Sequence, residues 1–250
     1  MHKHYYEKCK TEYPTSPEIE FDEYLHGIHV SRLSEDALIQ LLKSYDDNLS
    51  LQIPAGNSPS SRIWNTPPHC SSPDRDLEKS LEKASQEITK KISELMGCFT
   101  KVQEMKLIIH HKQHEDTKFR GAQYAWHWDN HPDELFNVML YLSDVEGEDD
   151  GAYQYMADTS GKGIINKGFD HNLTEEFAQQ LGIVKSVTGK AGDFFLFNNN
   201  NIHRAGVPTV KDRKVVLYQI RPCMKPVSKQ LDWNYLNQHF ETLLRWDLKA

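Results

Sequence analysis

The sequence predicts a mainly β protein, an antiparallel sandwich or jelly roll with helices on its outer face. Apolar residues recur with a helical period in the N-terminal part, and from Met105 onward the period changes to two. The segments with period two are short, and turn-rich pieces separate them. Helices followed by closely spaced strands are typical of this class. We expect one domain, with a helical support region at 1–104, a β core at 105–222 and a C-terminal helix at 223–250.

Two amphipathic helices are expected before the β core. The first begins after Ser34, whose hydroxyl suits an N-cap. The second has Ser72 as its cap, Pro73 in its first position and Gly97 at its end. Its apolar stripe suits packing against a flat surface and consists of Leu77, Leu81, Ala84, Ile88, Ile92 and Leu95.

The remaining segments follow from the same patterns. Residues 1–32 show no clear period, and residues 50–73, rich in Ser, Pro and Asn, predict a long irregular connection. Residues 173–182 predict a helix among the strands. The expected strands are "MKLIIHH", "AQYAWHWD", "LFNVMLYLSDV", "GAYQYMA", "IVKSVTG", "DFFLFN" and "KVVLYQIRP".

Composition narrows the class of protein. A net charge of -7 over 250 residues argues against a nucleic-acid partner, because the phosphate backbone demands a basic face. The four cysteines are widely spaced and predict ordinary thiols in a reducing compartment. The chain has neither a long apolar run nor an apolar segment at its start. We therefore expect a cytoplasmic monomer or homodimer with no membrane partner.

The pattern His-x-Asp, which can offer two metal ligands, occurs three times. A strand places residues i and i+2 on one face, so His127 and Asp129 in "AWHWDNHPDELF" would point the same way, with Trp126 and Trp128 turned to the opposite face as core. The pair at 131 and 133 flanks a proline that breaks a strand, and the pair at 114 and 116 lies in a charged loop. The strand argument therefore favours His127 and Asp129.

A third ligand and a cation follow later in the chain. His203 comes directly after the apolar strand in "AGDFFLFNNNNIHRAGVP", whose asparagine run is expected to form a turn. Two histidines and one carboxylate form the facial triad of non-haem Fe(II) oxygenases. Arg213 or Lys214 would hold the distal carboxylate of a 2-oxo acid. They point to opposite faces of one strand, so only one can serve. We prefer Arg213, because a guanidinium grips a carboxylate with two hydrogen bonds.

The segment from about Met105 to Pro222 resembles the Fe(II)/2-oxoglutarate-dependent dioxygenases, most of all their phytanoyl-CoA-hydroxylase-like and prolyl-hydroxylase-like branches. The pieces that carry the resemblance are "WHWDN", "VMLYLSDVEGEDDGAYQYM", "GKAGDFFLFNNNNIHRAGVP" and "DRKVVLYQIRP". The resemblance implies a double-stranded β-helix, a cupin-like jelly roll, with Fe(II) held by His127, Asp129 and His203. It also implies 2-oxoglutarate and O2 as co-substrates, and hydroxylation of a small-molecule metabolite with release of succinate and CO2.

Four further residues are candidates for binding the small molecules. Tyr141, Gln123 and Asn137 would touch 2-oxoglutarate beside Arg213, and Arg221 would suit an acidic substrate. A glycine-rich stretch at 158–172 is either a lid or an ordinary surface loop. Two alternatives remain open: hydroxylation of a protein side chain, and a cupin-like metal-binding domain without turnover. The second has no need of a cation for a 2-oxo acid.

Overall fold

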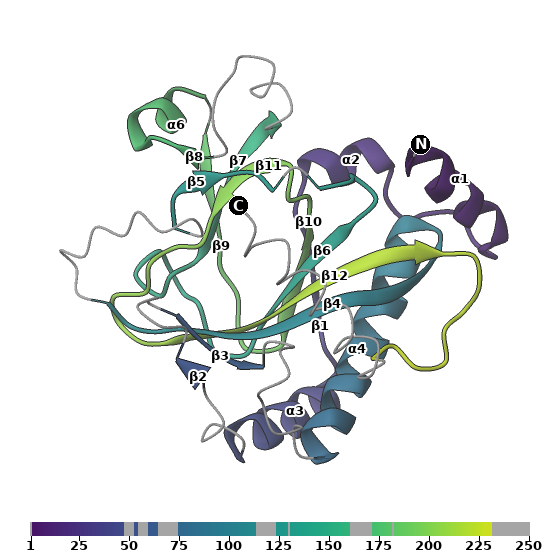
Figure 1. Ribbon diagram of the computed structural model, residues 1–250, viewed down its shortest axis with the longest axis horizontal. Coiled ribbons are helices and arrows are strands. Elements are labelled where there is room, and N and C mark those ends of the chain that lie inside the picture. Colours follow the sequence, from purple (N-terminus) through teal and green to yellow (C-terminus); the bar gives the residue numbers. More distant parts are fainter. Residues whose placement is uncertain are drawn as a thin grey trace, which may run out of the picture.

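Two antiparallel sheets form the centre of the computed structural model, which describes residues 2–47, 53–54, 60–64, 75–113, 124–129, 131–160, 172–181 and 183–231 (Figure 1). The larger sheet has the order β1 (His29–Arg32), β10 (Asp193–Phe197), β6 (Phe136–Tyr141), β12 (Arg213–Cys223), β4 (Phe99–His110), β3 (Ser60–Trp64) and β2 (Ile53–Pro54). The smaller sheet has the order β8 (Asn172–Leu173), β5 (Trp126–His127), β11 (Asn201–Arg204), β7 (Tyr153–Ser160) and β9 (Val184–Val187). The mainly β class is thus confirmed.

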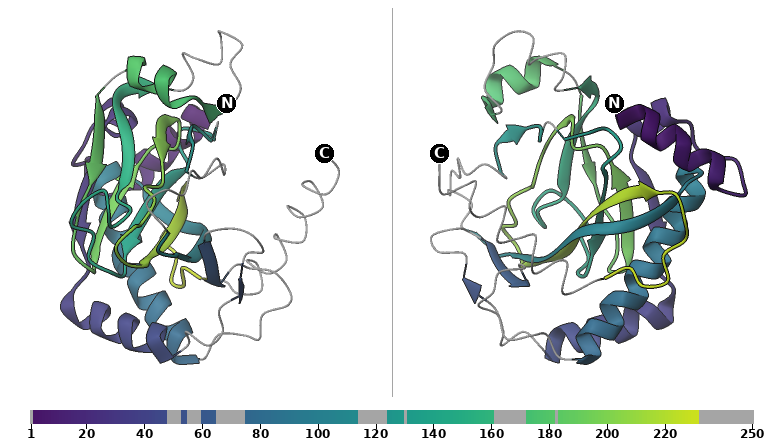
Figure 2. Two further views of the ribbon diagram at one scale, coloured as in Figure 1. Left: turned by 90° about the vertical axis from the view of Figure 1, so that its left-hand side faces the viewer. Right: turned by 45° about the vertical axis from the view of Figure 1, so that its right-hand side comes forward.

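Helices cover the larger sheet. They are α1 (His2–Glu12), α2 (Phe21–His26), α3 (Glu35–Asp47) and α4 (Arg75–Met96), while α6 (Glu175–Leu181) lies at the opposite end of the molecule from α3 (Figures 1 and 2). Ser34 caps α3 as expected, because its hydroxyl accepts a hydrogen bond from the amide of Ala37. Gly97 ends α4 with a φ of 62°, the left-handed conformation that favours glycine at this position. Within the described residues, no helix is both long enough and apolar enough to span a membrane.

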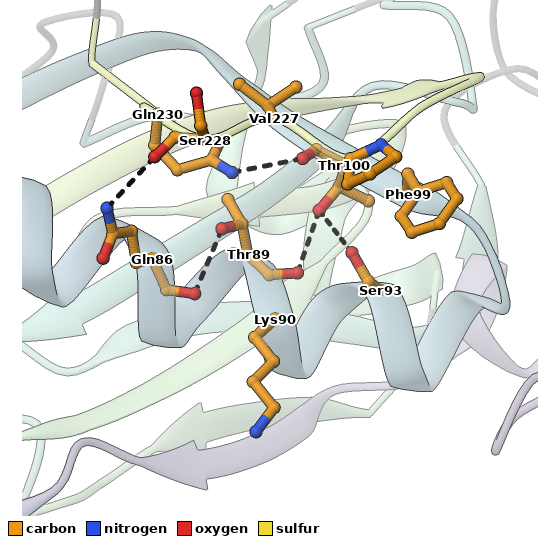
Figure 3. A pocket seen from close by; sticks show the side chains of 10 residues that line it. Gln86, Thr89, Lys90, Ser93, Phe99, Thr100, Val227, Ser228 and Gln230 are labelled. Carbon is orange, nitrogen blue, oxygen red and sulfur yellow. Dashed lines mark hydrogen bonds between the residues drawn. The ribbon is translucent and has the colours of Figure 1, made fainter.

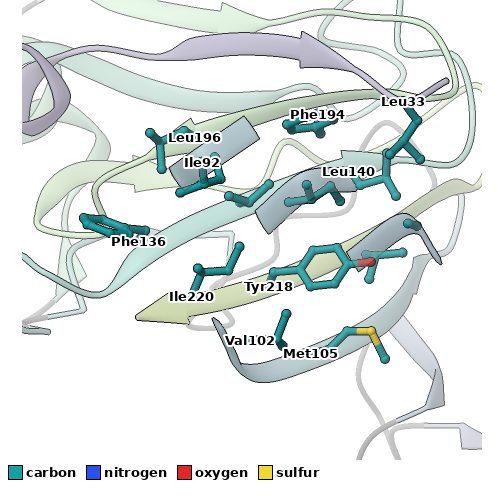
Figure 4. Close-up of a cluster of buried hydrophobic side chains, with 14 of the residues drawn as sticks. Leu33, Ile92, Val102, Met105, Phe136, Leu140, Phe194, Leu196, Tyr218 and Ile220 are labelled. Atoms are coloured by element: carbon teal, nitrogen blue, oxygen red, sulfur yellow. The ribbon is translucent and has the colours of Figure 1, made fainter. Parts of the chain in front are cut away.

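The apolar stripe of α4 packs on the outer face of the larger sheet, as its period predicts. All six stripe residues are buried. Ile92 belongs to one buried cluster with Leu140 of β6 and with Tyr218 and Ile220 of β12 (Figure 4). Burying a side chain of this size contributes about 1.5–3 kcal/mol, so this contact is a major part of the stability. The stripe packs against β6 and β12, which are neighbours in the middle of the larger sheet.

The opposite face of the larger sheet turns toward the smaller sheet. Met139 and Tyr141 of β6 and Val215 of β12 join Tyr153 of β7 in a second buried cluster. Successive side chains of β6 and β12 therefore point alternately into the outer cluster under the helices and into the cluster between the sheets, because side chains alternate along a strand. This second cluster is the space between the sheets, and the site described below borders it.

In the N-terminal third, residues 1–32 show no clear period, and the irregular connection predicted at 50–73 was wrong. Residues 1–32 contain α1 and α2, whose Tyr6 and Tyr24 are fully buried against the sheet. The stretch 50–73, expected to be irregular, contains β2 and β3. β3 pairs with β4, and β2 pairs with β3 at the end of the sheet. Backbone hydrogen bonds to a neighbouring strand form such short elements, and strands of two and five residues are too short to show a clear period. The expected C-terminal helix at 223–250 falls mostly on 232–250, outside the described residues. The lid candidate at 158–172 likewise falls mostly on 161–171, which also lie outside them.

Candidate metal centre

Two neighbouring strands of the smaller sheet bring the two histidines together. His127 on β5 and His203 on β11 are directly paired in the antiparallel register, and their ring centroids are 4.3 Å apart. Asp129 follows two residues after His127, and its Oδ1 lies 3.6 Å from Nε2 of His127. One potential ligand atom from each of the three residues lies within 4.8 Å of the others. The spacing suits a single metal ion bound by two imidazoles and one carboxylate.

Both imidazoles are oriented by the backbone in the same way. Nδ1 of His127 lies 2.7 Å from the carbonyl oxygen of Ala125, and Nδ1 of His203 lies 2.8 Å from that of Asn201. A carbonyl only accepts hydrogen bonds, so each Nδ1 carries a proton and Nε2 is the ring nitrogen available to a metal. The hydrogen bond at the nitrogen that does not bind the metal fixes the tautomer and the ring orientation of a metal-binding histidine.

The carboxylate of Asp129 is held by the asparagine run. Asn199 donates a hydrogen bond of 2.6 Å from Nδ2 to Oδ2 of Asp129, and its carbonyl accepts the amide of Asp129 at 3.0 Å. Oδ2 is therefore occupied, while Oδ1 faces His127. The next residue, Asn200, donates to the carbonyl of His131 and to Asp133, which secures the turn after Asp129.

This run, residues 198–201, was expected to be a turn on sequence grounds, and its site role was missed. All four asparagines are at most 4% exposed. Four consecutive buried amides are unusual, because polar groups are buried only when they have hydrogen-bond partners. Their position directly before a candidate ligand is the signal that could have identified them.

Burial keeps His203 neutral. Enclosure in the protein lowers the pKa of His203, and the neighbouring His127 lowers it further. A neutral imidazole is the form that binds a metal. The side chain of Asp129 is 31% exposed, against 16% for His127, so the group opens to solvent on the Asp129 side. The triad is thus partly accessible to solvent through Asp129.

The tryptophans beside the histidine face away from the triad, as the alternation predicts. Trp126 and Trp128 are buried with Ile202 and Leu173, and Phe177 of α6 packs against the same cluster. The expectation that these rings are core is consistent with this. Their helical partner is α6 rather than the N-terminal helices.

Arg213 is buried between the sheets. Its side chain is 1% exposed, and Nη1 donates a hydrogen bond to the carbonyl oxygen of Gly151. Nε and Nη2 have no hydrogen-bond partner among the residues that the structure describes. Burial lowers the pKa of Arg213, yet a guanidinium stays charged in proteins. A buried cation with two unused donors points to an anionic ligand.

Lys214 lies on the other face of β12. Its Nζ is 3.3 Å from Asp46 of α3 and 5.3 Å from the ring centroid of Tyr45. The side chain therefore packs against the outer helices. Of the two basic residues, Arg213 is the one that faces the space between the sheets.

The other candidate residues are more dispersed. Tyr141 and Asn137 lie on the inner face of β6, where the Tyr141 hydroxyl donates to Val187 at 2.7 Å and Asn137 Nδ2 donates to Leu135 at 3.0 Å. Oδ1 of Asn137 is buried and lacks a partner within the described part of the chain. Arg221 is exposed at the other end of β12 from Arg213. Gln123 lies outside the described residues.

A separate pocket of about 270 Å³ lies between α4 and the segment that follows β12. Thr89, Ser93 and Thr100 line it and bond to one another, and Gln230 also bonds to Thr100 (Figure 3). None of the residues that line it belongs to the triad. Its polar groups satisfy one another, so the pocket gives no sign of a ligand.

No family model matches the chain, and no curated protein sequence matches it. Solved structures do match. SnoN, an alpha ketoglutarate dependent epimerase from nogalamycin biosynthesis, was solved with Fe3+, alpha ketoglutarate and nogalamycin RO. It is 12% identical with a TM-score of 0.57, over 88% of this chain and 84% of SnoN.

Two further solved structures have a similar fold. The carbocyclase SnoK of the same biosynthesis is 15% identical with a TM-score of 0.56, over 83% of this chain and 87% of SnoK. HygX from Streptomyces hygroscopicus, solved with nickel and 2-oxoglutarate, is 14% identical with a TM-score of 0.54, over 85% and 89%. These matches show that the chain has the fold of the non-heme enzymes that depend on alpha ketoglutarate, which is 2-oxoglutarate.

Proposed function

We propose that this chain is an Fe(II)- and 2-oxoglutarate-dependent oxygenase that acts on a small-molecule metabolite. The observation that carries the proposal is the pairing of two features: a His-Asp-His group with ligand atoms within 4.8 Å, and a buried arginine with unused donors. In this proposal the two sheets are the halves of a double-stranded β-helix. The fold alone would leave the function open, because one fold supports many activities.

The donor set fits Fe(II). Two neutral imidazoles and one carboxylate oxygen occupy one side of a metal and leave positions for a chelating co-substrate and O2. When bound there, the metal would activate O2 as 2-oxoglutarate is converted to succinate and CO2. His127 and His203 supply Nε2, and Asp129 supplies the oxygen that Asn199 leaves free.

Arg213 fits the distal carboxylate of 2-oxoglutarate. Nε and Nη2 form one edge of the guanidinium, and both N–H groups on that edge are unused. A carboxylate can accept both hydrogen bonds at once, in the bidentate geometry that arginine favours. Tyr141 also lies near this cation, since the charge of Arg213 acts on its hydroxyl. Asn137, Gln123 and Arg221 stay predictions as binding residues.

The space between the sheets is lined by aromatic side chains, which suits a reaction that must exclude water. Tyr153 and Phe197 pack beside His203, and Phe195 packs against both of them; each of the three is at most 2% exposed. An apolar wall of this kind would strengthen the hydrogen bonds of Arg213 and would shield the His203 side of a bound metal from bulk water. Hydroxylation is the outcome we propose. SnoN is described as an epimerase and SnoK as a carbocyclase, so the products assayed must include isomers and ring-closed compounds.

The alternative of a metal-binding domain without turnover does not account for Arg213. Burying an unpaired guanidinium is costly, and a bare metal binder gains nothing from it. Hydroxylation of a protein side chain would require an extended groove for a peptide. The solved structures that match include SnoN with nogalamycin RO bound, which favours a small molecule.

The test of this proposal is succinate formation with Fe(II), 2-oxoglutarate and O2 but without added substrate. We expect slow uncoupled turnover that is lost in His127→Ala and kept in His131→Ala, the histidine of the neighbouring His-x-Asp. For 2-oxoglutarate binding, Arg213→Gln should weaken affinity strongly, while Lys214→Gln on the opposite face of β12 should not. Equal loss in the members of either pair would contradict the assignment.

A further inference from the structure

The hydroxyl of Tyr153 is a buried polar group that the roles above do not use. Tyr153 begins β7 and is 2% exposed. Its ring stacks on the imidazole of His203, with centroids 5.6 Å apart and planes inclined by 25°. The hydroxyl has no hydrogen-bond partner in the described part of the chain. Buried tyrosine hydroxyls usually have a partner, so this one requires an explanation.

The protein around this ring offers mainly apolar surface. Phe197 lies 4.8 Å and Phe195 lies 5.4 Å from the ring of Tyr153, centroid to centroid. Neither residue can accept a conventional hydrogen bond. The negative charge of Asp129 also acts on the phenol, which places Tyr153 on the side of the triad.

The start of β7 also lies beside Arg213. Gly151, two residues before Tyr153, accepts the hydrogen bond from Nη1 of Arg213. The amide of Tyr153 itself donates to the hydroxyl of Tyr141 at 3.3 Å. Residues 151–153 therefore connect the buried cation to the triad. A 2-oxo acid that reached from Arg213 to a metal at the triad would pass along this segment.

We propose that the Tyr153 hydroxyl donates a hydrogen bond to a carboxylate or keto oxygen of the 2-oxo acid bound between Arg213 and the triad. The inference rests on the proposed function. Tyr153 would then have two roles: its ring fixes the imidazole of His203, and its hydroxyl binds the co-substrate. Only the second role depends on the hydroxyl, so a phenylalanine at this position separates the two.

The experiment compares Tyr153→Phe with Tyr45→Phe. Tyr45 is a matched control, because it is fully buried and its hydroxyl also lacks a partner among the described residues, but it packs between α3 and the outer face of the sheet. Each protein is loaded with Fe(II) without oxygen and titrated with 2-oxoglutarate by calorimetry. We expect Tyr153→Phe to bind 2-oxoglutarate about tenfold more weakly, the effect of one hydrogen bond to a charged group. Tyr45→Phe should bind it like the unmodified protein.

Each result has a distinct meaning. Failure of the unmodified, Fe(II)-loaded protein to bind 2-oxoglutarate overturns the proposed function and this inference with it. Binding that is equal in the unmodified protein and in Tyr153→Phe overturns this inference alone. Weaker Fe(II) affinity in Tyr153→Phe would show that the residue acts through His203, and this also overturns the role of the hydroxyl. Weaker 2-oxoglutarate binding with Fe(II) affinity unchanged supports it.

Discussion

Replacing Asn199 by alanine tests how the asparagine run prepares the metal centre. Asn199 Nδ2 donates to Oδ2 of Asp129 at 2.6 Å, a hydrogen bond to a charged acceptor. Such a bond contributes about 1.5–3 kcal/mol. Loss of a residue that orients a metal ligand typically reduces affinity about 10–100-fold, which corresponds to about 1.4–2.8 kcal/mol. The two magnitudes agree, so Asn199→Ala should bind Fe(II) about 10–100-fold more weakly.

The matched control for this prediction is Asn200→Ala. Asn200 is equally buried, but its amide donates to the carbonyl of His131 and to Asp133 rather than to Asp129. We expect this variant to lose stability and to keep its metal affinity. The assay is anaerobic calorimetric titration with Fe(II), alongside urea unfolding of the metal-free proteins. Unchanged affinity in Asn199→Ala, or an equal loss in both variants, would refute the reasoning.

Three further predictions concern stability, and urea unfolding measures each of them. Ile88→Ala should reduce the free energy of unfolding by about 2–5 kcal/mol, because Ile88 is fully buried on the inner side of α4 and its truncation leaves a cavity. A change below about 1 kcal/mol would contradict the packing described for α4. Gly97→Ala should destabilise by about 1 kcal/mol or more, since φ is 62° and an added Cβ would lie 2.7 Å from the nitrogen of Pro17; an unchanged midpoint would refute this. The pKa of Asp144 lies below its usual 3.8, mainly because its carboxylate accepts a hydrogen bond from the amide of Ala191, and secondly because it accepts one from Lys190. A carboxyl group whose pKa is lower in the folded than in the unfolded protein stabilises the fold at pH values above its unfolded pKa. This stabilisation is lost as the pH falls through the folded pKa. In Asp144→Asn, the decline of the free energy of unfolding below pH 3.8 should therefore be less steep. An equally steep decline in Asp144→Asn would contradict that assignment.

The preference for one of the three His-x-Asp pairs rested on local geometry, and the structure brings the preferred pair together with His203. At β5 and just after it, His127 and Asp129 point one way while Trp126 and Trp128 join a buried cluster on the other side, because side chains alternate along an extended backbone. Pro132 ends that geometry before the next pair. The stripe of α4 and its end at Gly97 were predictable for the same reason: a helical period and a glycine in a left-handed conformation depend on residues close in the sequence.

Elements that form by backbone pairing could not be predicted in this way. β4 offers β3 an edge with unpaired amide and carbonyl groups, and β3 in turn offers an edge to β2; these edges appear only when the sheet has formed. α1 and α2 lack a strong period, yet Tyr6 and Tyr24 are buried by the sheet they meet. In both regions a distant part of the chain supplies the stabilising contact.

The sequence by itself determined the two periodicities, the face that His127 and Asp129 share, and the short list of basic residues on β12. Each of these depends on bond geometry within a few residues. Only the tertiary structure brought His203 to within 4.3 Å of His127 between ring centroids and buried Arg213 rather than Lys214. It alone also turned the asparagine run into the support of Asp129 and left the hydroxyl of Tyr153 without a partner in the described part of the chain. The physical reason is that the pairing of strands far apart in sequence, and the packing of helices on one face of the larger sheet, decide which face becomes the interior.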